Sequence, residues 1–181
     1  MNIVHVTGAP AAGGAEVYVR DLSEGLVKMG HRVMVLFISH AQDIGLSSQF
    51  EENYLAVLEE SGVEYAFLEL KNRKNFILGG IRLRKIVRAF QADVVHTHLY
   101  YAAIYSFLSP VKVVYTHHNI ILRVPHVFYR IVMNQIVDQY IGICEPCAKV
   151  LAEASARDVV KIYNGVSLER LTIKSDYEQV E

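Results

Sequence analysis

Short runs of apolar, β-branched residues alternate along the chain with longer stretches in which apolar residues recur every three or four positions. Over Gly14–Met29 this spacing predicts a helix that ends at Gly30. Further helices are predicted over Gln49–Ser61 and Gly79–Phe90, and a loop over residues 39–50. Seven strands are expected at Asn2–Val6, Arg32–Ile38, Val63–Leu68, Asp93–Thr97, Lys112–Thr116, Gln139–Ile143 and Val159–Tyr163.

The predicted strands are continuous apolar runs, which is typical of strands that are buried on both faces of a sheet. Their alternation with helices indicates an α/β fold: a Rossmann-like, doubly wound parallel sheet of about seven strands, with helices on both faces. We assign residues 1–165 to this domain. A turn is expected at Asn164-Gly165, and the polar residues 166–181 are expected to form the start of a linker or a tail.

Length and composition limit the alternatives. A chain of 181 residues with 52% hydrophobic and 20% charged residues has the size of one globular domain with a large core. The net charge of −1 gives no global attraction to nucleic acid, and two cysteines are too few for a disulfide framework. No signal peptide and no apolar run of about 20 residues is recognised, so we expect a cytoplasmic location.

A glycine-containing loop, Thr7–Gly14, follows the first predicted strand. Parallel α/β sheets bind ligands at the carboxyl ends of their strands. Gly13 and Gly14 stand there at the start of a helix, where free N–H groups and the helix dipole favour an anion. The loop is not a P-loop, because Gly14-Ala15 stands where Lys-Ser/Thr is required. A tight turn without a ligand is the alternative.

Histidines gather after the fourth and fifth predicted strands, which neighbour the first strand in the usual order 3-2-1-4-5. The candidates for one crevice are His96, His98, Tyr100, His117, His118 and Asn119. His96 and His98 have a spacing that suits two metal ligands on one strand face. Metal hydrolases usually also place carboxylates in the pocket, and only Asp93 is near, so we expect no metal. His5 and His31 are expected to be structural.

Several motifs occur in order along nearly the whole chain: Gly13-Gly14-Ala15-Glu16, Gly30-His31-Arg32-Val33, Asp93–His98, Thr116-His117-His118-Asn119, Glu145 and Asn164-Gly165-Val166. Together they resemble the N-terminal, acceptor-side half of retaining family-4 glycosyltransferases of the GT-B type. The resemblance implies transfer of a sugar from a nucleotide-diphosphate sugar to a glycan, lipid or small-molecule acceptor, with no further cofactor.

The resemblance also implies roles for individual residues. Gly13 and Gly14 would approach the donor diphosphate, and His118 would contact the donor sugar region as the candidate catalytic residue. The remaining candidates for the cleft and the acceptor are Glu16, His96, His98, Tyr100, His117, Asn119 and Glu145.

Two features depart from the family pattern. Cys144 stands before Glu145, where the family usually has serine. The family's donor-binding domain follows the Asn-Gly-Val linker, whereas this sequence ends at Glu181, so we expect that domain to be absent and the isolated chain to be inactive. Glu52 and Glu60 match the spacing of a donor motif from that domain, but their helix belongs to the first domain and predicts a solvated face.

Other functions stay open. A non-catalytic Rossmann-like binding module or a metal-dependent enzyme would use the same crevice. A thiol-dependent enzyme would use Cys144 and Cys147, a C-x-x-C pair at a predicted helix start, where a thiolate is stabilised. Thioredoxin-like pairs follow the first strand of a smaller unit, whereas this pair follows the sixth, so buried or capping thiols are the prediction.

A basic segment covers residues 71–92, which contain no acidic side chain. Its basic residues are Lys71, Arg73, Lys74, Arg82, Arg84, Lys85 and Arg88. The segment indicates either a solvated helix face over an apolar stripe or peripheral docking on anionic lipid or on a phosphorylated acceptor. Nucleic acid is not expected, because the segment matches no known nucleic-acid-binding module.

Overall fold

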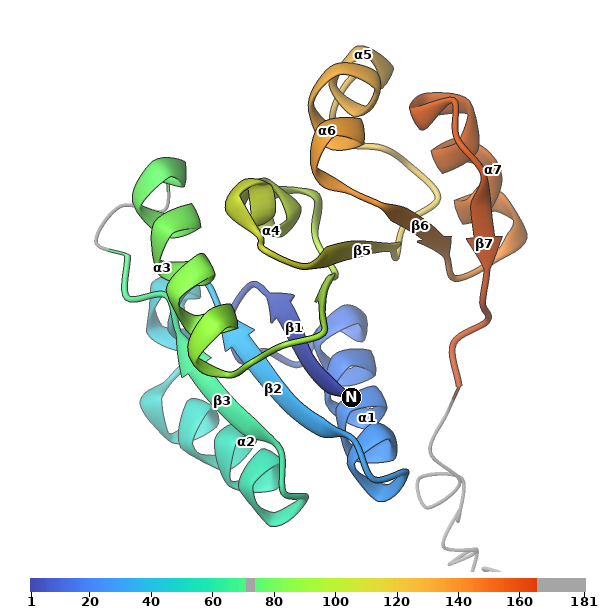
Figure 1. The fold of residues 1–181 in the computed structure, drawn as a ribbon. Helices are drawn as coiled ribbons and strands as arrows, with labels where there is room; N and C mark the ends of the chain where they lie inside the picture. The colour runs from blue at the N-terminus through green and yellow to red at the C-terminus, as the bar shows by residue number, and fades with distance from the viewer. Residues whose placement is uncertain (71–73, 166–181) are drawn as a thin grey trace, which may run out of the picture.

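The computed structural model describes residues 1–70 and 74–165 (Figure 1). Their strands form one parallel sheet in the order β3-β2-β1-β4-β5-β6-β7. The strands are β1 (Asn2–Thr7), β2 (Arg32–Phe37), β3 (Glu64–Phe67), β4 (Val94–Thr97), β5 (Lys112–His117), β6 (Gln139–Gly142) and β7 (Val159–Lys161). The predicted Rossmann-like fold is confirmed.

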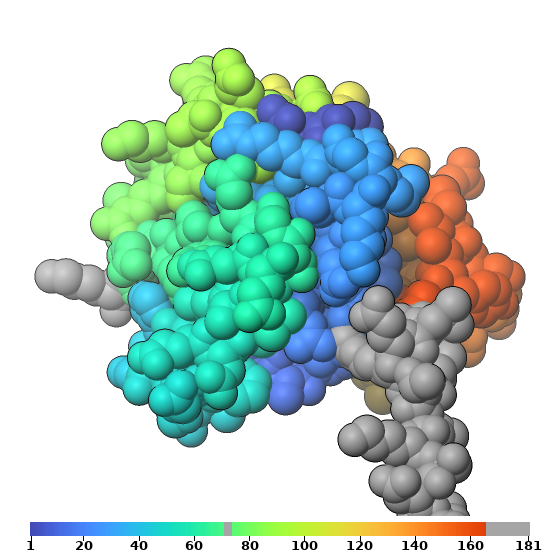
Figure 2. All heavy atoms as spheres, turned by 90° about the horizontal axis from the view of Figure 1, so that it is seen from below, coloured from blue at the N-terminus to red at the C-terminus, as the bar shows by residue number. Residues whose placement is uncertain are grey.

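Helices cover both faces of the sheet. On one face α1 (Gly14–Lys28) and α2 (Ser48–Glu60) pack over the first three strands, and they lie side by side at the surface (Figure 2). On the other face lie α3 (Phe76–Ala89), α4 (Tyr100–Tyr105), α5 (His126–Phe128), a π-helical turn (Tyr129–Met133), α6 (Asn134–Ile136) and α7 (Glu145–Ser155). Each face therefore has its own apolar core.

Strand β1 divides its side chains between these two layers. Successive side chains of a strand point to opposite faces. Val4 and Val6 enter the larger core under α3 and α4. His5 and Thr7 point toward the layer of α1, and both are fully buried. This alternation puts a histidine in the middle of the sheet, on the face that α1 covers.

Helix α1 ends where the sequence predicts. Gly30 has a φ of +86°, a left-handed conformation that glycine adopts without a Cβ penalty. The N–H of Gly30 donates to Val27 O, and the N–H of His31 donates to Leu26 O. These bonds satisfy the last carbonyl groups of the helix and turn the chain into β2.

Helix α3 begins earlier than predicted. It starts at Phe76, because the side chain of Asn75 accepts a hydrogen bond from Leu78 N–H and caps the helix. Gly79 and Gly80 are therefore inside the helix rather than at its start. A Cβ on Gly79 would lie 2.2 Å from the Tyr105 ring, so the absence of a side chain allows α3 to pack closely against α4.

Two other predicted segments need correction. The expected loop at residues 39–50 contains a short 3-10 helix, η1 (Ala41–Ile44), and the first turn of α2, which Ser47 caps by accepting from Phe50 N–H. Strand β7 ends at Lys161, earlier than the predicted Tyr163. The predicted linker or tail of residues 166–181 lies outside the described residues, as do Lys71 and Arg73 of the basic segment.

Candidate functional site

The carboxyl ends of β1, β4 and β5 lie next to one another, because these strands are neighbours in the sheet. The chain leaves β1 into the glycine loop and α1, and leaves β5 at His118. The ring of His118 lies 5.1 Å from that of Tyr18 in the second turn of α1. The structure thus brings His118 to the same edge as the glycine loop.

The start of α1 is open to solvent and has no side-chain cap. Gly13 is the N-cap residue, and it has no side chain that could accept from the first N–H groups of the helix. A Cβ on Gly14 would meet no atom within 4 Å, whereas one on Gly13 would lie 2.4 Å from Glu16 Oε2. Glu16 therefore holds its carboxylate over the loop, where an acid interacts favourably with the helix dipole. An incoming anion would meet this carboxylate first.

Three histidines form a hydrogen-bonded chain across this edge. His5 Nδ1 lies 3.0 Å from His98 Nε2, and His98 Nδ1 lies 3.2 Å from His118 Nε2. His98 is 1% exposed and His5 is fully buried, so the bond between them lies inside the protein, whereas the bond to His118 is part-buried. Both ring nitrogens of His98 are used, and the chain of bonds leads from the middle of β1 to the edge of the sheet.

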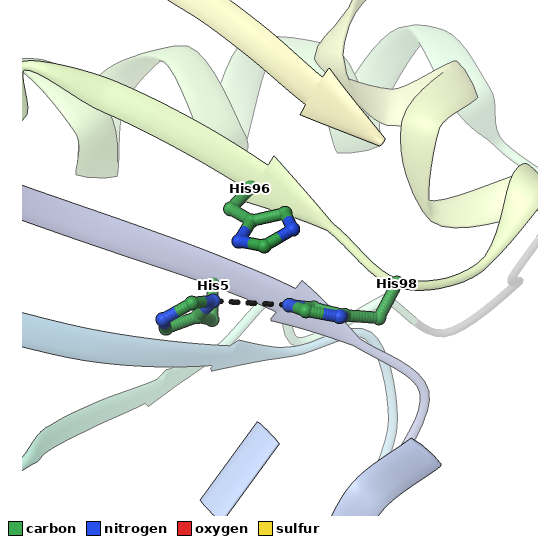
Figure 3. A group of neighbouring side chains, drawn as sticks. All are labelled: His5, His96 and His98. Carbon is green, nitrogen blue, oxygen red and sulfur yellow. Dashed lines mark hydrogen bonds between the residues drawn. The ribbon is translucent and has the colours of Figure 1, made fainter. Parts of the chain in front are cut away.

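His96 lies beside this chain. Its ring centroid is 4.2 Å from that of His98 and 5.1 Å from that of His5 (Figure 3). His96 Nε2 is 2.7 Å from the hydroxyl oxygen of Thr116 on β5. The register of β1 on β4 places His5 directly opposite His96, which explains why three rings from two strands meet.

The histidine group has the geometry to hold a metal ion, since His5, His96 and His98 offer nitrogens within 4.8 Å of one another. Three imidazoles would suit Zn²⁺. No carboxylate belongs to this group, and His98 has both nitrogens engaged with other histidines. That the site functions without a metal stays a prediction.

Burial keeps these imidazoles neutral at pH 7. It lowers the pKa of His5 to about 4 and, with a smaller contribution from His117, that of His118 to about 4. Burial, followed by the charges of neighbouring histidines, holds the pKa of His96 and His98 well below the usual value. A neutral imidazole carries one N–H and one acceptor nitrogen, so each ring can donate a hydrogen bond through one nitrogen and accept one through the other.

Several predicted site residues lie apart from this group. His117 is buried on the opposite face of the sheet, where its Nδ1 is 2.9 Å from the Tyr115 hydroxyl. Tyr100, the first residue of α4, packs edge-on against Tyr101 and Phe128. Glu145 forms an ion pair with Lys161 at the end of β7. Asn119 is exposed just past His118.

Two members of the group were not expected from the sequence. His5 is predicted to be structural, yet it is the inner end of the histidine chain. The signal for His5 is its position opposite His96, and that position follows only from the register of two residues that are 91 apart in the sequence. Tyr18 is not among the residues predicted for the site, and its ring packs edge-on against both His98 and His118.

The cysteine pair consists of one capping and one buried thiol, as predicted. Cys144 is the N-cap of α7, and its Sγ accepts a hydrogen bond from Cys147 N–H at 3.3 Å. Cys147 is buried, and burial and the neighbouring Cys144 raise its pKa to about 11. Both thiols are free, and that of Cys147 stays protonated at neutral pH.

The basic segment combines bound and exposed side chains on α3. Arg82 donates to the backbone carbonyls of Leu68 and Glu69, and Arg84 donates to Leu108 O at 3.1 Å. Ile77 and Ile81 are exposed at 70% and 52%. Within the described part of the chain, no helix has the length and apolarity needed to cross a membrane.

Known structures share this architecture at low sequence identity. A glycosyltransferase from Rickettsia africae ESF-5 superposes with a TM-score of 0.72 at 17% identity, over 94% of this chain and 45% of that one. HepE of Anabaena, solved with UDP and glucose, gives 0.64 at 19% identity, over 93% and 46%. MurG of Acinetobacter baumannii gives 0.62 at 12%, over 92% and 46%. The chain thus spans less than half the length of these structures.

Sequence comparison gives the family. No curated protein matches the chain at a significant level. The model of glycosyltransferase family 4 matches residues 12–170, which include Gly13 and Gly14, His96, His98, His118 and the cysteine pair. The chain therefore belongs to glycosyltransferase family 4, and its described residues have the fold of an N-terminal GT-B domain.

Proposed function

We propose that the chain is the acceptor-side half of a glycosyltransferase that moves a sugar from a nucleotide-diphosphate sugar to a glycan, lipid or small-molecule acceptor. The observation that carries the proposal is the meeting of the uncapped start of α1 with His118 at one edge of the sheet. HepE, which shares the fold, was solved with UDP and glucose, and this supports a nucleotide sugar as the donor.

The geometry suits the charge that develops in sugar transfer. When the bond between the sugar and the diphosphate breaks, negative charge grows on the leaving diphosphate. Fixed N–H dipoles at the start of α1, after Gly13 and Gly14, stabilise such charge without moving. His98 holds His118 at the same edge, and this supports a contact of His118 with the sugar or diphosphate oxygens.

A second domain is the implied partner, and we propose that it supplies most of the binding energy for the donor. An anion at one exposed helix end gains about 0.3–1 kcal/mol. A micromolar complex needs about 8 kcal/mol. We therefore expect the 181-residue chain to bind nucleotide sugars no tighter than about millimolar and to transfer no sugar by itself.

Calorimetry and NMR test this proposal together. Calorimetry with uridine, guanosine and adenosine diphosphate sugars is expected to give no micromolar binding. At millimolar concentration the matching sugar nucleotide is expected to shift the amide signals of Gly13 and Gly14. Micromolar binding would instead identify a complete, non-catalytic binding module. Unchanged glycine signals with every nucleotide would remove the donor site from this loop.

We also propose that α3 contacts the surface of an anionic membrane, from the cytoplasmic side. Its first two turns expose Ile77 and Ile81, Lys85 follows Ile81 by one helical turn, and Lys74 lies just before the helix. Apolar side chains flanked by cations suit an interfacial helix. Vesicle sedimentation is expected to show binding that requires anionic lipid and weakens with salt. An Ile77→Ser/Ile81→Ser variant is expected to bind less, and equal binding to neutral vesicles would contradict the proposal.

A further inference from the structure

The hydrogen bonds of His5, His98 and His118 restrict where these three rings carry their protons. His98 bonds His5 with one ring nitrogen and His118 with the other. Each bond needs one donor and one acceptor nitrogen. Because the rings are neutral at pH 7, the three protons can be arranged in only two ways that keep both bonds.

In the outward arrangement every ring carries its proton on Nδ1. His5 then donates to His98, and His98 donates to His118 Nε2. His118 is left with an N–H on Nδ1. In the inward arrangement every proton is on Nε2, so His118 donates to His98 and His98 donates to His5. His118 Nδ1 is then a bare acceptor.

The inner end of the chain distinguishes the two arrangements. His5 Nε2 is fully buried and has no hydrogen-bond partner in the described residues. The inward arrangement would put a proton on this nitrogen and leave a buried N–H without an acceptor. The outward arrangement leaves only an unused lone pair there. Buried N–H groups without an acceptor are rarer in proteins than acceptors that lack a donor.

The outer end is free to meet a ligand. Residues 1–70 and 74–165 provide no hydrogen bond to His118 Nδ1, whereas its Nε2 is engaged by His98. His118 is partly exposed at the edge where α1 begins. Its Nδ1 is therefore the nitrogen that remains available to an oxygen of a bound molecule.

We propose that His5 and His98 are positioning residues that fix His118 with its proton on Nδ1. His118 then donates a hydrogen bond to a phosphate or hydroxyl oxygen of the substrate and does not act as a general base. This inference rests on the proposed function of the edge as a donor site. It adds the direction of the hydrogen bond and the two residues that set it.

The tautomers are measured directly by ¹⁵N NMR of the imidazole rings in the ligand-free 181-residue chain at pH 7. The signals of the eight histidines are assigned by replacing one histidine at a time with glutamine. We expect His5, His98 and His118 each to carry the proton on Nδ1. A proton on Nε2 of His118, or an even mixture of its two tautomers, would overturn the proposal.

Variants of His98 test whether this residue sets the tautomer. An asparagine side chain places an amide N–H near the position of imidazole Nδ1, so His98→Asn is expected to keep the Nδ1 proton on His118. His98→Leu has a similar size but no donor, and it is expected to release His118 into a mixture of tautomers. His117, which bonds Tyr115 on the other face, is the internal control and should not change. Release of His118 by both variants, or by neither, contradicts a positioning role for His98.

Addition of inorganic pyrophosphate separates this inference from the proposed function. If the NMR signals of Gly14 N–H and His118 Nδ1 both shift, the result supports the anion site at α1 and the hydrogen-bond donor role of His118. A shift at Gly14 without one at His118 refutes the donor role of His118 and leaves the anion site. No shift at either residue at high pyrophosphate concentration refutes the anion site itself, while the tautomer measured without ligand still tests the positioning by His5 and His98.

Discussion

The histidine group and the cysteine pair differ in where their polar atoms find partners. Cys144 and Cys147 are three residues apart and satisfy each other within the first turn of α7. His5 comes from the middle of β1, and His98 and His118 follow the ends of β4 and β5, so these three residues satisfy each other only across the sheet. The contact of the cysteines completes a helix cap, whereas the series of histidines ends at His118 Nδ1, which faces the open edge of the sheet. A pair that is complete within one helical turn is explained by local structure, whereas the histidine contacts need the whole sheet.

The largest expected difference between the two regions is in the pH dependence of stability. The pKa of His5 is lowered to about 4 in the folded state, so the unfolded chain takes up protons that the folded protein excludes. Stability is then complete above pH 6.5 and is lost as the pH falls toward 4. For His5 alone the free energy of unfolding should be about 2 kcal/mol lower at pH 5 than at pH 7.

Urea unfolding at pH 7 and pH 5 measures how much the free energy of unfolding falls with pH in the wild type and in His5→Asn. The difference between the two falls is the contribution of His5. The double variant Cys144→Ser/Cys147→Ala is the matched control and should keep the wild-type pH dependence, because it leaves all the histidines in place. An equal loss of stability in wild type and His5→Asn would contradict the cost assigned to buried His5.

The two cysteines should themselves respond differently to the same substitution. Cys147→Ser places a hydroxyl in a site that is 1% exposed and should lower the free energy of unfolding by about 1–3 kcal/mol. Cys144→Ser keeps an N-cap acceptor, and should be neutral or stabilise by up to about 1 kcal/mol. Thermal unfolding compares the two variants. Equal destabilisation by both would show that Cys144 does more than cap α7.

A smaller effect is expected from the carboxylate that covers the glycine loop. Glu16 places a negative charge next to the start of α1, so Glu16→Gln should ease the approach of an anion. The affinity for pyrophosphate should rise by a factor of about two to five, which corresponds to about 0.3–1 kcal/mol. NMR titration of the Gly14 amide measures it, with Glu24→Gln at a later turn of α1 as the control. Lower affinity in Glu16→Gln would mean that Glu16 organises the loop for its ligand.

The smallest expected effect is that of Gly14→Ala on stability. The added methyl group would meet no atom within 4 Å, so the free energy of unfolding should change by less than about 0.5 kcal/mol. In a transferase that contains both domains, the same change should reduce activity, because the methyl group stands where the diphosphate is proposed to lie. Thermal unfolding and transfer assays check the two parts. A large loss of stability would make the glycine a structural requirement instead.

Much of the fold could be predicted from the sequence because each strand and helix is set by local pattern. Gly30 marked the end of α1 because it was needed for a left-handed turn. The start of α3 was missed because Gly79 and Gly80 look like a break in a helix when their neighbours are unknown. Their small size serves contact with Tyr105 and Phe107, which follow about 25 residues later.

The sequence by itself determined the alternation of strands and helices, the family and the edge at which the ligand-facing loops meet. Periodicity and short motifs carry that information, and each depends on residues close together in the chain. Only the tertiary structure decided that His118 contacts His98 whereas His117 lies on the other face of the sheet. It also decided that His5 contacts His98 and that Glu145 pairs with Lys161. Adjacent residues of a strand face opposite layers, and the pairing register of distant strands decides which rings meet.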